Sequence, residues 1–199
     1  MPRKKLCKNL ENKILSVAEK LFLEKGYNKT GIRDIAKECG ISIGLIYKIF
    51  ESKEDIFIRI LKKHIKIALK EINEALSQAT SFEDKLNKFL ENFIKQFRKK
   101  EKFFYIFLTS LGTNFLIDKK RFQLQDIAQK ISQIFQNILE EGKQKGFIDK
   151  NIDTFFLSKY ILGGIINNIY GYVIEKNEKL PENFLDMTKN IIKKFLNKK

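Results

Sequence analysis

The sequence predicts an all-α fold of about nine helices. Apolar residues recur every three or four positions along most of the chain, which is the period of amphipathic helices. No segment alternates apolar and polar residues as a strand would. Only two prolines and ten glycines occur in 199 residues, so we expect the helices between them to be long.

The composition is that of a folded, basic chain. Hydrophobic residues make up 43% and charged residues 32%, which supplies a core and excludes a disordered chain. The formal charge of +15 is spread evenly, because residues 1–60 carry 13 basic against 8 acidic side chains and residues 61–199 carry 26 against 16. The charge therefore favours polyanionic partners without locating a nucleic-acid site.

Cysteine and histidine usage indicates a reducing compartment and no metal site. Cys7 and Cys39 are too few for a disulfide framework, and His64 is the only histidine. A redox-sensing role for Cys39 is the alternative to an inert thiol. No apolar stretch is long enough for a signal peptide or a membrane span. We expect a soluble, cytoplasmic protein without a cofactor or a membrane partner.

The first helix is predicted over residues 9–25. Ile14, Ala18 and Phe22 lie on one face of it, with charged residues elsewhere. Gly26 follows the last turn, where a C-terminal cap is expected.

Residues 31–50 predict a helix-turn-helix, a motif whose second helix enters the major groove of DNA. Gly40 supplies the left-handed backbone of the turn, and Ser42 caps the second helix. Ile46 and Phe50, four residues apart, are expected to hold that helix on the domain.

Capping boxes and glycines place the remaining helices. Ser52 and Asp55 open a long linking helix over 53–78, and Ser81 and Asp84 open the helix after it. Pro181 suits the first turn of the last helix. The other expected segments are an aromatic run over 103–108, a periodic stretch over about 118–145, and terminal helices over 153–176 and 181–197.

The run from Ile14 to Leu61 closely resembles the DNA-binding region of the tetracycline-repressor (TetR) family. The similar positions are Ala18, Leu21, Phe22, Gly26, Tyr27, Thr30, Asp34, Ile35, Ala36, Gly40, Ile41, Ser42, Gly44, Tyr47, Phe50, Ser52, Lys53 and Glu54. The resemblance implies a homodimeric transcriptional repressor on palindromic operator DNA. It implies a DNA-binding domain over 8–68 and an effector-binding and dimerisation domain over 69–199.

The resemblance also implies operator contacts. Tyr47, Lys53 and the Thr30 region match positions that usually contact phosphates, and residues 42–48 match the part that faces base edges. The basic arm over residues 3–8 is either a further backbone contact or a solvated tail. The expected DNA-binding residues are Thr30, Gly31, Ile32, Arg33, Ser42, Ile43, Gly44, Leu45, Tyr47, Lys48 and Lys53.

Three positions depart from the family pattern. Gly31 replaces a common Ser or Thr cap, although glycine still caps and Asp34 can accept the backbone amide. Ile43 stands where Lys or Arg is frequent, and Ile49 where His is frequent. Apolar side chains can touch thymine methyl groups but cannot pair with guanine, so we predict an A·T-rich operator read partly by shape. Alternatively, some of these isoleucines pack inward.

The last two helices are expected to dimerise. The resemblance implies a four-helix bundle with a partner, and the helix over 153–176 is apolar nearly all round, which requires cover on more than one side. The expected interface residues are Ile161, Ile165, Ile169, Tyr172, Phe184, Thr188, Ile191 and Phe195.

A pocket for a small hydrophobic or aromatic effector is expected between the middle helices. The chain has eighteen phenylalanines and six tyrosines, which could line an apolar cavity or form the core. Asn167 and Asn168 need hydrogen-bond partners if buried, and His64 is either a pocket residue or a surface histidine. The expected pocket residues are His64, Phe89, Phe93, Phe97, Tyr105, Asn114, Tyr160, Asn167, Asn168 and Tyr170.

Other classes of function compete less well. A single histidine, no nucleophile elbow and no phosphate-binding glycine loop argue against an enzyme, so no catalytic residue is expected. A regulator of the same family that activates, or that needs no ligand, is one alternative. A basic helical membrane-surface or interaction protein is the other.

Overall fold

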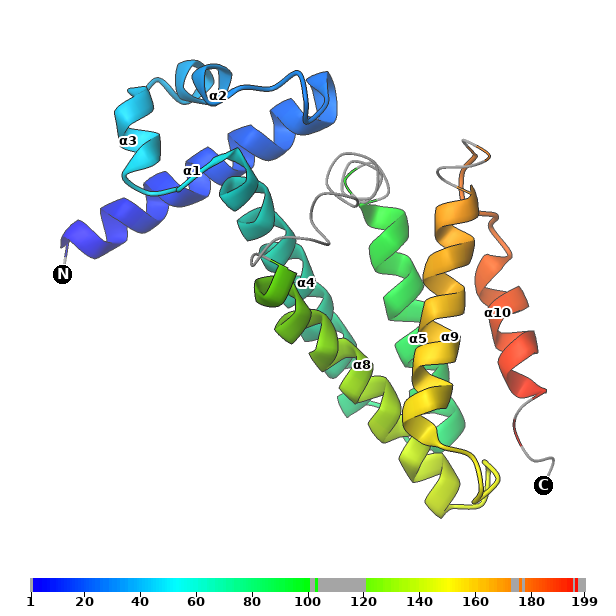
Figure 1. Ribbon diagram of the computed structural model, residues 1–199. Coiled ribbons are helices and arrows are strands. Elements are labelled where there is room, and N and C mark those ends of the chain that lie inside the picture. The colour runs from blue at the N-terminus through cyan, green and yellow to red at the C-terminus, as the bar shows by residue number, and fades with distance from the viewer. Residues whose placement is uncertain are drawn as a thin grey trace. The chain divides into compact units, whose positions relative to one another are not determined.

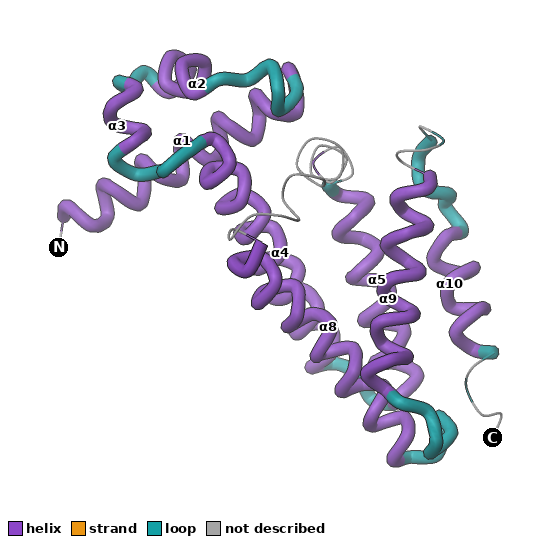
Figure 2. Tube along the Cα trace, in the orientation of Figure 1, coloured by secondary structure: helices purple, strands orange, loops and turns teal. Residues whose placement is uncertain are grey.

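The computed structural model describes residues 2–100, 103, 121–172, 176, 178–194 and 196, with side chains from residue 8 onward except those of 121–128. All regular elements in these ranges are helices, which confirms the all-α class (Figure 2). Against about nine expected helices, the described ranges hold α1 (Pro2–Lys25), α2 (Ile32–Cys39), α3 (Ile43–Tyr47), α4 (Lys53–Ser77), α5 (Phe82–Lys99), α8 (Arg121–Gln144), α9 (Thr154–Tyr170) and α10 (Phe184–Lys193). The predicted site residues Tyr105, Asn114 and Phe195 lie outside them.

The chain divides into two compact units. The first comprises Met1–His64 and Lys102–Leu124, and the second comprises Ile65–Glu101 and Gln125–Lys199. Helix α4 belongs to both, since the division crosses it after His64 (Figure 1). The expected boundary between residues 68 and 69 stays a prediction. No helix within the described ranges is both long and apolar enough to cross a membrane.

The first unit packs around an aromatic cluster. Phe57 of α4 is fully buried, and its ring centroid lies 5.8 Å from that of Phe22 on α1 and 5.3 Å from that of Tyr27. On the same ring, Phe103 stacks at a centroid distance of 4.6 Å. A residue from the part of the chain after α5 therefore completes the core of the unit that holds α1 to α3.

Local sequence signals set the helix boundaries as expected. Gly26 and Gly40 have φ angles of 86° and 66°, the left-handed conformation that glycine adopts without strain. The Ser52 hydroxyl accepts a hydrogen bond from the Asp55 amide at 3.2 Å. The Ser81 hydroxyl accepts one from the Asp84 amide at 3.1 Å. Each cap satisfies an amide that has no partner within its helix.

The second unit buries the inner sides of α5, α8, α9 and α10. Phe89 is fully buried, with ring centroids 5.8 Å from Phe93 and 4.6 Å from Phe135. At the start of α5, the ring of Phe82 stacks on that of Phe147 with centroids 5.0 Å apart and fills the space beside Gly142 of α8. These phenylalanines pack α5 against α8 and the segment that follows it.

Candidate nucleic-acid interface

The helix-turn-helix is formed by α2, a turn at residues 40–42, and α3. Ile35 and Ala36 of α2 are buried, as are Ile46 and Phe50 on and just after α3. The Ile41 amide donates to the Ala36 carbonyl at 3.0 Å, which closes the turn that Gly40 permits. These contacts confirm the sequence prediction of two short helices held by an apolar inner face.

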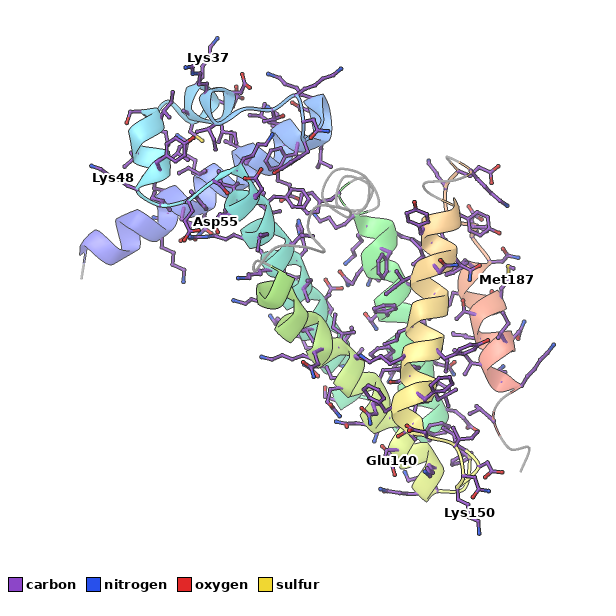
Figure 3. The ribbon with its side chains drawn as sticks, viewed as in Figure 1. Lys37, Lys48, Asp55, Glu140, Lys150 and Met187 are labelled. Atoms are coloured by element: carbon purple, nitrogen blue, oxygen red, sulfur yellow. The ribbon has the colours of Figure 1, made fainter. Side chains whose placement is uncertain are left out.

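Helix α3 turns a mixed polar and apolar surface outward. The Ser42 hydroxyl accepts the Leu45 amide at 3.2 Å and caps the helix. Ile43 is 38% exposed and Tyr47 55% exposed, and the Lys48 side chain points away from the unit (Figure 3). Gly44 is also exposed, whereas Leu45 and Ile49 are half-buried, so Ile43 is the apolar side chain most available to a base.

Helix α2 adds cationic side chains beside α3. Arg33 is exposed, Ile32 is half-buried, and the Gly31 amide donates to the Asp34 carboxylate at 2.8 Å, so the expected glycine cap forms. Lys37, also exposed and pointing away from the unit, was not among the predicted contacts (Figure 3). Its spacing of four residues from Arg33 places both on one helix face, a signal that the sequence offered.

Thr30 and Lys53 point into the unit. Thr30 is fully buried, and its hydroxyl donates to the Gly26 carbonyl at 2.8 Å. The Lys53 ammonium donates to the Tyr27 and Thr30 carbonyls at 2.9 and 3.1 Å and lies 4.2 Å from the Tyr27 ring centroid. Burial lowers the pKa of this ammonium, an effect that Glu54 opposes. The Thr30 side chain thus closes the turn after α1, and the Lys53 side chain ties this turn to the start of α4.

Tyr27 and Glu54 complete this junction. The Tyr27 hydroxyl donates to the Glu54 carboxylate at 2.9 Å. Burial, followed by the charge of Glu54, raises the pKa of Tyr27 far above its ordinary value. Burial opposes the charge of Glu54 itself, but hydrogen bonds from its own backbone, Ser52 and Tyr27 hold the pKa of this carboxyl low. The phenol is therefore a hydrogen-bond donor here and not an acid.

Three cationic side chains of the first unit donate hydrogen bonds to backbone carbonyls at or just after the ends of helices. The Lys13 ammonium donates to the Cys39 carbonyl at 2.9 Å, at the end of α2. Lys53 serves the turn after α1, and Arg59 donates to the Ile49 carbonyl at 3.0 Å, just after α3. Cationic donors at these ends satisfy unpaired carbonyls and complement the helix dipole.

The residues predicted for the dimer interface fall on two sides of α9 and α10. Buried positions in the core of the second unit are Ile161, Ile165, Ile169, Phe184 and Thr188. Tyr172 is half-buried, and Ile191 is 58% exposed. The outward side of α9 carries other large side chains, with Phe156 68% and Tyr160 63% exposed, and Met187 of α10 is 45% exposed (Figure 3).

The predicted pocket residues that lie within the described ranges belong to both units of the chain. Phe89 and Phe93 are buried and Phe97 is half-buried in the core of the second unit. His64 belongs to the first unit, where its Nε2 lies 2.9 Å from a Glu19 carboxylate oxygen and its ring contacts Phe103 edge-on. The exposed predicted residues, all on α9, are Tyr160, Asn167, Asn168 and Tyr170.

The amide pair on α9 is exposed. The Asn168 side-chain amide donates to the Gly164 carbonyl at 2.8 Å, within its own helix. Asn167 lies on the same outward side. Their hydrogen-bonding capacity therefore does not require a ligand. Among the residues that the structure describes, no three His, Cys, Asp or Glu side chains are grouped to hold a metal ion.

A capped helix-turn-helix with polar and cationic residues on its outward side, followed by a second helical unit, defines a DNA-binding regulator. The sequence profile described as "Bacterial regulatory proteins, tetR family" matches residues 14–60, and that described as "YsiA-like protein, C-terminal region" matches residues 61–196. The chain belongs to the TetR family of transcriptional regulators. This confirms the resemblance and the expectation of a protein that is not an enzyme.

Individual relatives are similar over most of the chain. The fatty acid metabolism regulator protein of Bacillus subtilis is 24% identical over 161 residues, which cover 81% of this chain and 82% of the relative. IcaR of Staphylococcus aureus, a negative transcriptional regulator of the biofilm operon icaADBC, is 25% identical over 191 residues, 93% and 100% of the two chains. The structure of FadR from Bacillus subtilis in complex with stearoyl-CoA has a TM-score of 0.75 at 21% identity and covers 93% and 97%.

Proposed function

We propose that this chain is a ligand-responsive repressor that binds operator DNA as a homodimer and releases it when an acyl-CoA binds. The observation that carries the DNA-binding part is the outward face of α3, where Ser42, Tyr47 and Lys48 are exposed on a helix fixed by its buried face. Similarity to IcaR, a negative transcriptional regulator, supports the proposed repression. Similarity to FadR, which was solved in complex with stearoyl-CoA, supports the proposed effector.

The operator is proposed to be palindromic and rich in A·T pairs. Ile43 is the exposed apolar residue of α3 and suits contact with a thymine methyl group. Ser42 and Lys48, at the two ends of this helix, are the polar side chains available to hydrogen-bond base edges. Phosphate contacts from Tyr47, Arg33 and Lys37 would fix the register of the helix on the duplex. Two identical recognition helices require half-sites about 34–36 Å apart.

The dimer is proposed to form through the outward sides of α9 and α10. Phe156 and Tyr160 of α9 and Met187 and Ile191 of α10 are exposed apolar side chains in a unit whose inner faces already form its core. The rings of Phe156 and Tyr160 stack with centroids 6.3 Å apart, and contiguous exposed apolar groups of this kind mark interaction surfaces. Both helices are those that the family uses for dimerisation.

The effector is proposed to be a long-chain acyl-CoA. A fatty acid metabolism regulator is similar over 81% of this chain, and stearoyl-CoA is the ligand of a regulator with the same fold. An acyl chain needs an apolar lining, and Phe89, Phe93 and Phe97 form a continuous aromatic row along α5. Displacement of this row would admit the chain and move the helices that carry it, which shifts the population away from the DNA-binding form.

The test has two stages. Duplexes bound by the full chain are selected from random DNA, and A·T-rich palindromes are expected; sites with invariant guanines opposite α3 would contradict the operator proposal. Stearoyl-CoA is then titrated into the complex with the selected duplex while fluorescence anisotropy is followed. Release by stearoyl-CoA but not by free coenzyme A supports the effector class, and equal binding in the presence of either compound contradicts it.

A further inference from the structure

Arg59 of α4 joins three parts of the first unit through one guanidinium group. Its Nη1 donates to a Glu11 carboxylate oxygen on α1 at 2.8 Å. Its Nε and Nη2 donate to the two Asp55 carboxylate oxygens at 3.2 and 3.1 Å. Nη2 also donates to the Ile49 carbonyl at 3.0 Å, and the guanidinium lies 4.7 Å from the Phe50 ring centroid.

This network lies at the C-terminal end of the recognition helix. Helix α3 is a five-residue segment, and one helical turn has little stability of its own. Its direction therefore depends on tertiary contacts. The buried Ile46 and Phe50 fix its inner face, but apolar contacts are not directional, whereas the hydrogen bond from Arg59 to Ile49 is.

The Asp55 carboxylate extends the network into the connection between α3 and α4. Its Oδ2 accepts the Glu51 amide at 3.1 Å, and its own amide donates to Ser52. The Asp55 side chain is 14% exposed, while those of Arg59 and Glu11 are each 34% exposed, so the ion pairs are partly shielded from solvent. One cation thus holds two carboxylates and a carbonyl in fixed relative positions.

We propose that Arg59 is a positioning residue for sequence reading: it sets the direction of α3 by fixing the Ile49 carbonyl to α1 and α4, and it does not itself contact DNA. The inference rests on the proposed operator binding. Without the guanidinium, Glu11 and Asp55 lose their common partner and the Ile49 carbonyl loses its donor. The recognition helix then samples several directions, and contacts to base edges depend on its direction more than contacts to phosphates do.

The experiment compares Arg59→Met, Arg59→Lys and the control Lys63→Met, which removes an exposed cation from the same helix. The probes are the duplex selected by the unaltered chain and a scrambled duplex of the same base composition. For Arg59→Met, the ratio of the two affinities is expected to fall about tenfold, the equivalent of one base contact. Lysine keeps the charge but cannot present the planar fork of the guanidinium group. The affinity ratio of Arg59→Lys is therefore expected to lie between that of Arg59→Met and that of the unaltered chain.

The salt dependence of binding separates positioning from direct contact. Loss of a phosphate contact lowers the slope of log affinity against log salt by about 0.9, whereas a positioning residue leaves the slope unchanged. A slope lowered in this way in Arg59→Met, or an affinity ratio equal to that of Lys63→Met, overturns the proposal. If Arg59→Met does not fold, as judged by circular dichroism, Arg59→Lys decides on the same two measurements. Failure of the unaltered chain to select any duplex would instead contradict the proposed function.

Discussion

The ring of Phe82, at the start of α5, occupies the space that a side chain at Gly142 of α8 would need. A Cβ atom placed on Gly142 would overlap three atoms of this ring, while one placed on Gly163 of α9 would meet nothing within 4 Å. Phe82 is 1% exposed and stacks on Phe147, so the ring is enclosed by the core of the second unit. The glycine at residue 142 is therefore fixed by packing.

Gly142→Ala is expected to destabilise the second unit by about 1–3 kcal/mol, the range for overpacking a close-packed core. Urea unfolding followed by circular dichroism measures the change. Gly163→Ala is the matched control, because it adds the same methyl group to a helix where the space is open. Equal stability of the two variants would contradict the close contact.

Lys53→Met is expected to lower stability by about 1–3 kcal/mol, because two backbone carbonyls lose their donor. Its salt dependence of operator binding is expected to equal that of the unaltered chain. Lys37→Met, at an exposed position proposed to contact a phosphate, is expected to lower the salt slope by about 0.9. A reduced slope in Lys53→Met would show instead that this ammonium contacts a phosphate.

Thermal stability is expected to fall on acidification below about pH 4. A hydrogen bond from the Thr80 amide, followed by Lys88, holds the pKa of Asp84 below its ordinary value, and hydrogen bonds from Lys145 and Lys85 do the same for Glu141. Carboxyls with a lowered pKa in the folded state stabilise it above their unfolded pKa and lose this effect as they are protonated. Melting curves recorded between about pH 7 and pH 3 measure this loss as a fall in melting temperature. Asp84→Asn should flatten the profile, and an unchanged profile would contradict the assignment.

Tyr160→Glu and Ile191→Glu are each expected to convert the proposed dimer to monomer, because each places a charge among apolar side chains that two copies would bury. Sedimentation velocity gives the mass in solution. Lys150→Glu, at an exposed position between α8 and α9, is the control for the change in charge. Dimers that persist in both α9 and α10 variants would place the interface elsewhere.

Local signals in the sequence predicted local structure well. Gly40, Ser42 and the serine-aspartate boxes act within four residues, so the helix-turn-helix and the starts of α4 and α5 could be read from their spacing. The function of the first unit followed from the same short segment. The second unit offers few such signals, and its effector remains a proposal.

Contacts between distant residues were the part that the sequence could not supply. Periodicity selects a buried face only when the opposite face is polar, and α9 is apolar nearly all round. Ile161 and Ile165, which are predicted interface residues, are buried in the core of the second unit, and their part in a dimer stays a prediction. Likewise, the residues next to Lys53 in the sequence do not indicate that its ammonium donates to backbone carbonyls 23 and 26 residues away.

The stacking of Phe103 on Phe57 has a consequence for biosynthesis. The first unit is discontinuous in the chain, so its aromatic cluster cannot close while only the first 64 residues have left the ribosome. Until residue 103 emerges, one face of Phe57 lacks its stacked ring. The core of the unit that carries the helix-turn-helix is therefore completed only after α5 has been synthesised. A fragment that stops at residue 64 would lack the Phe103 ring from this core.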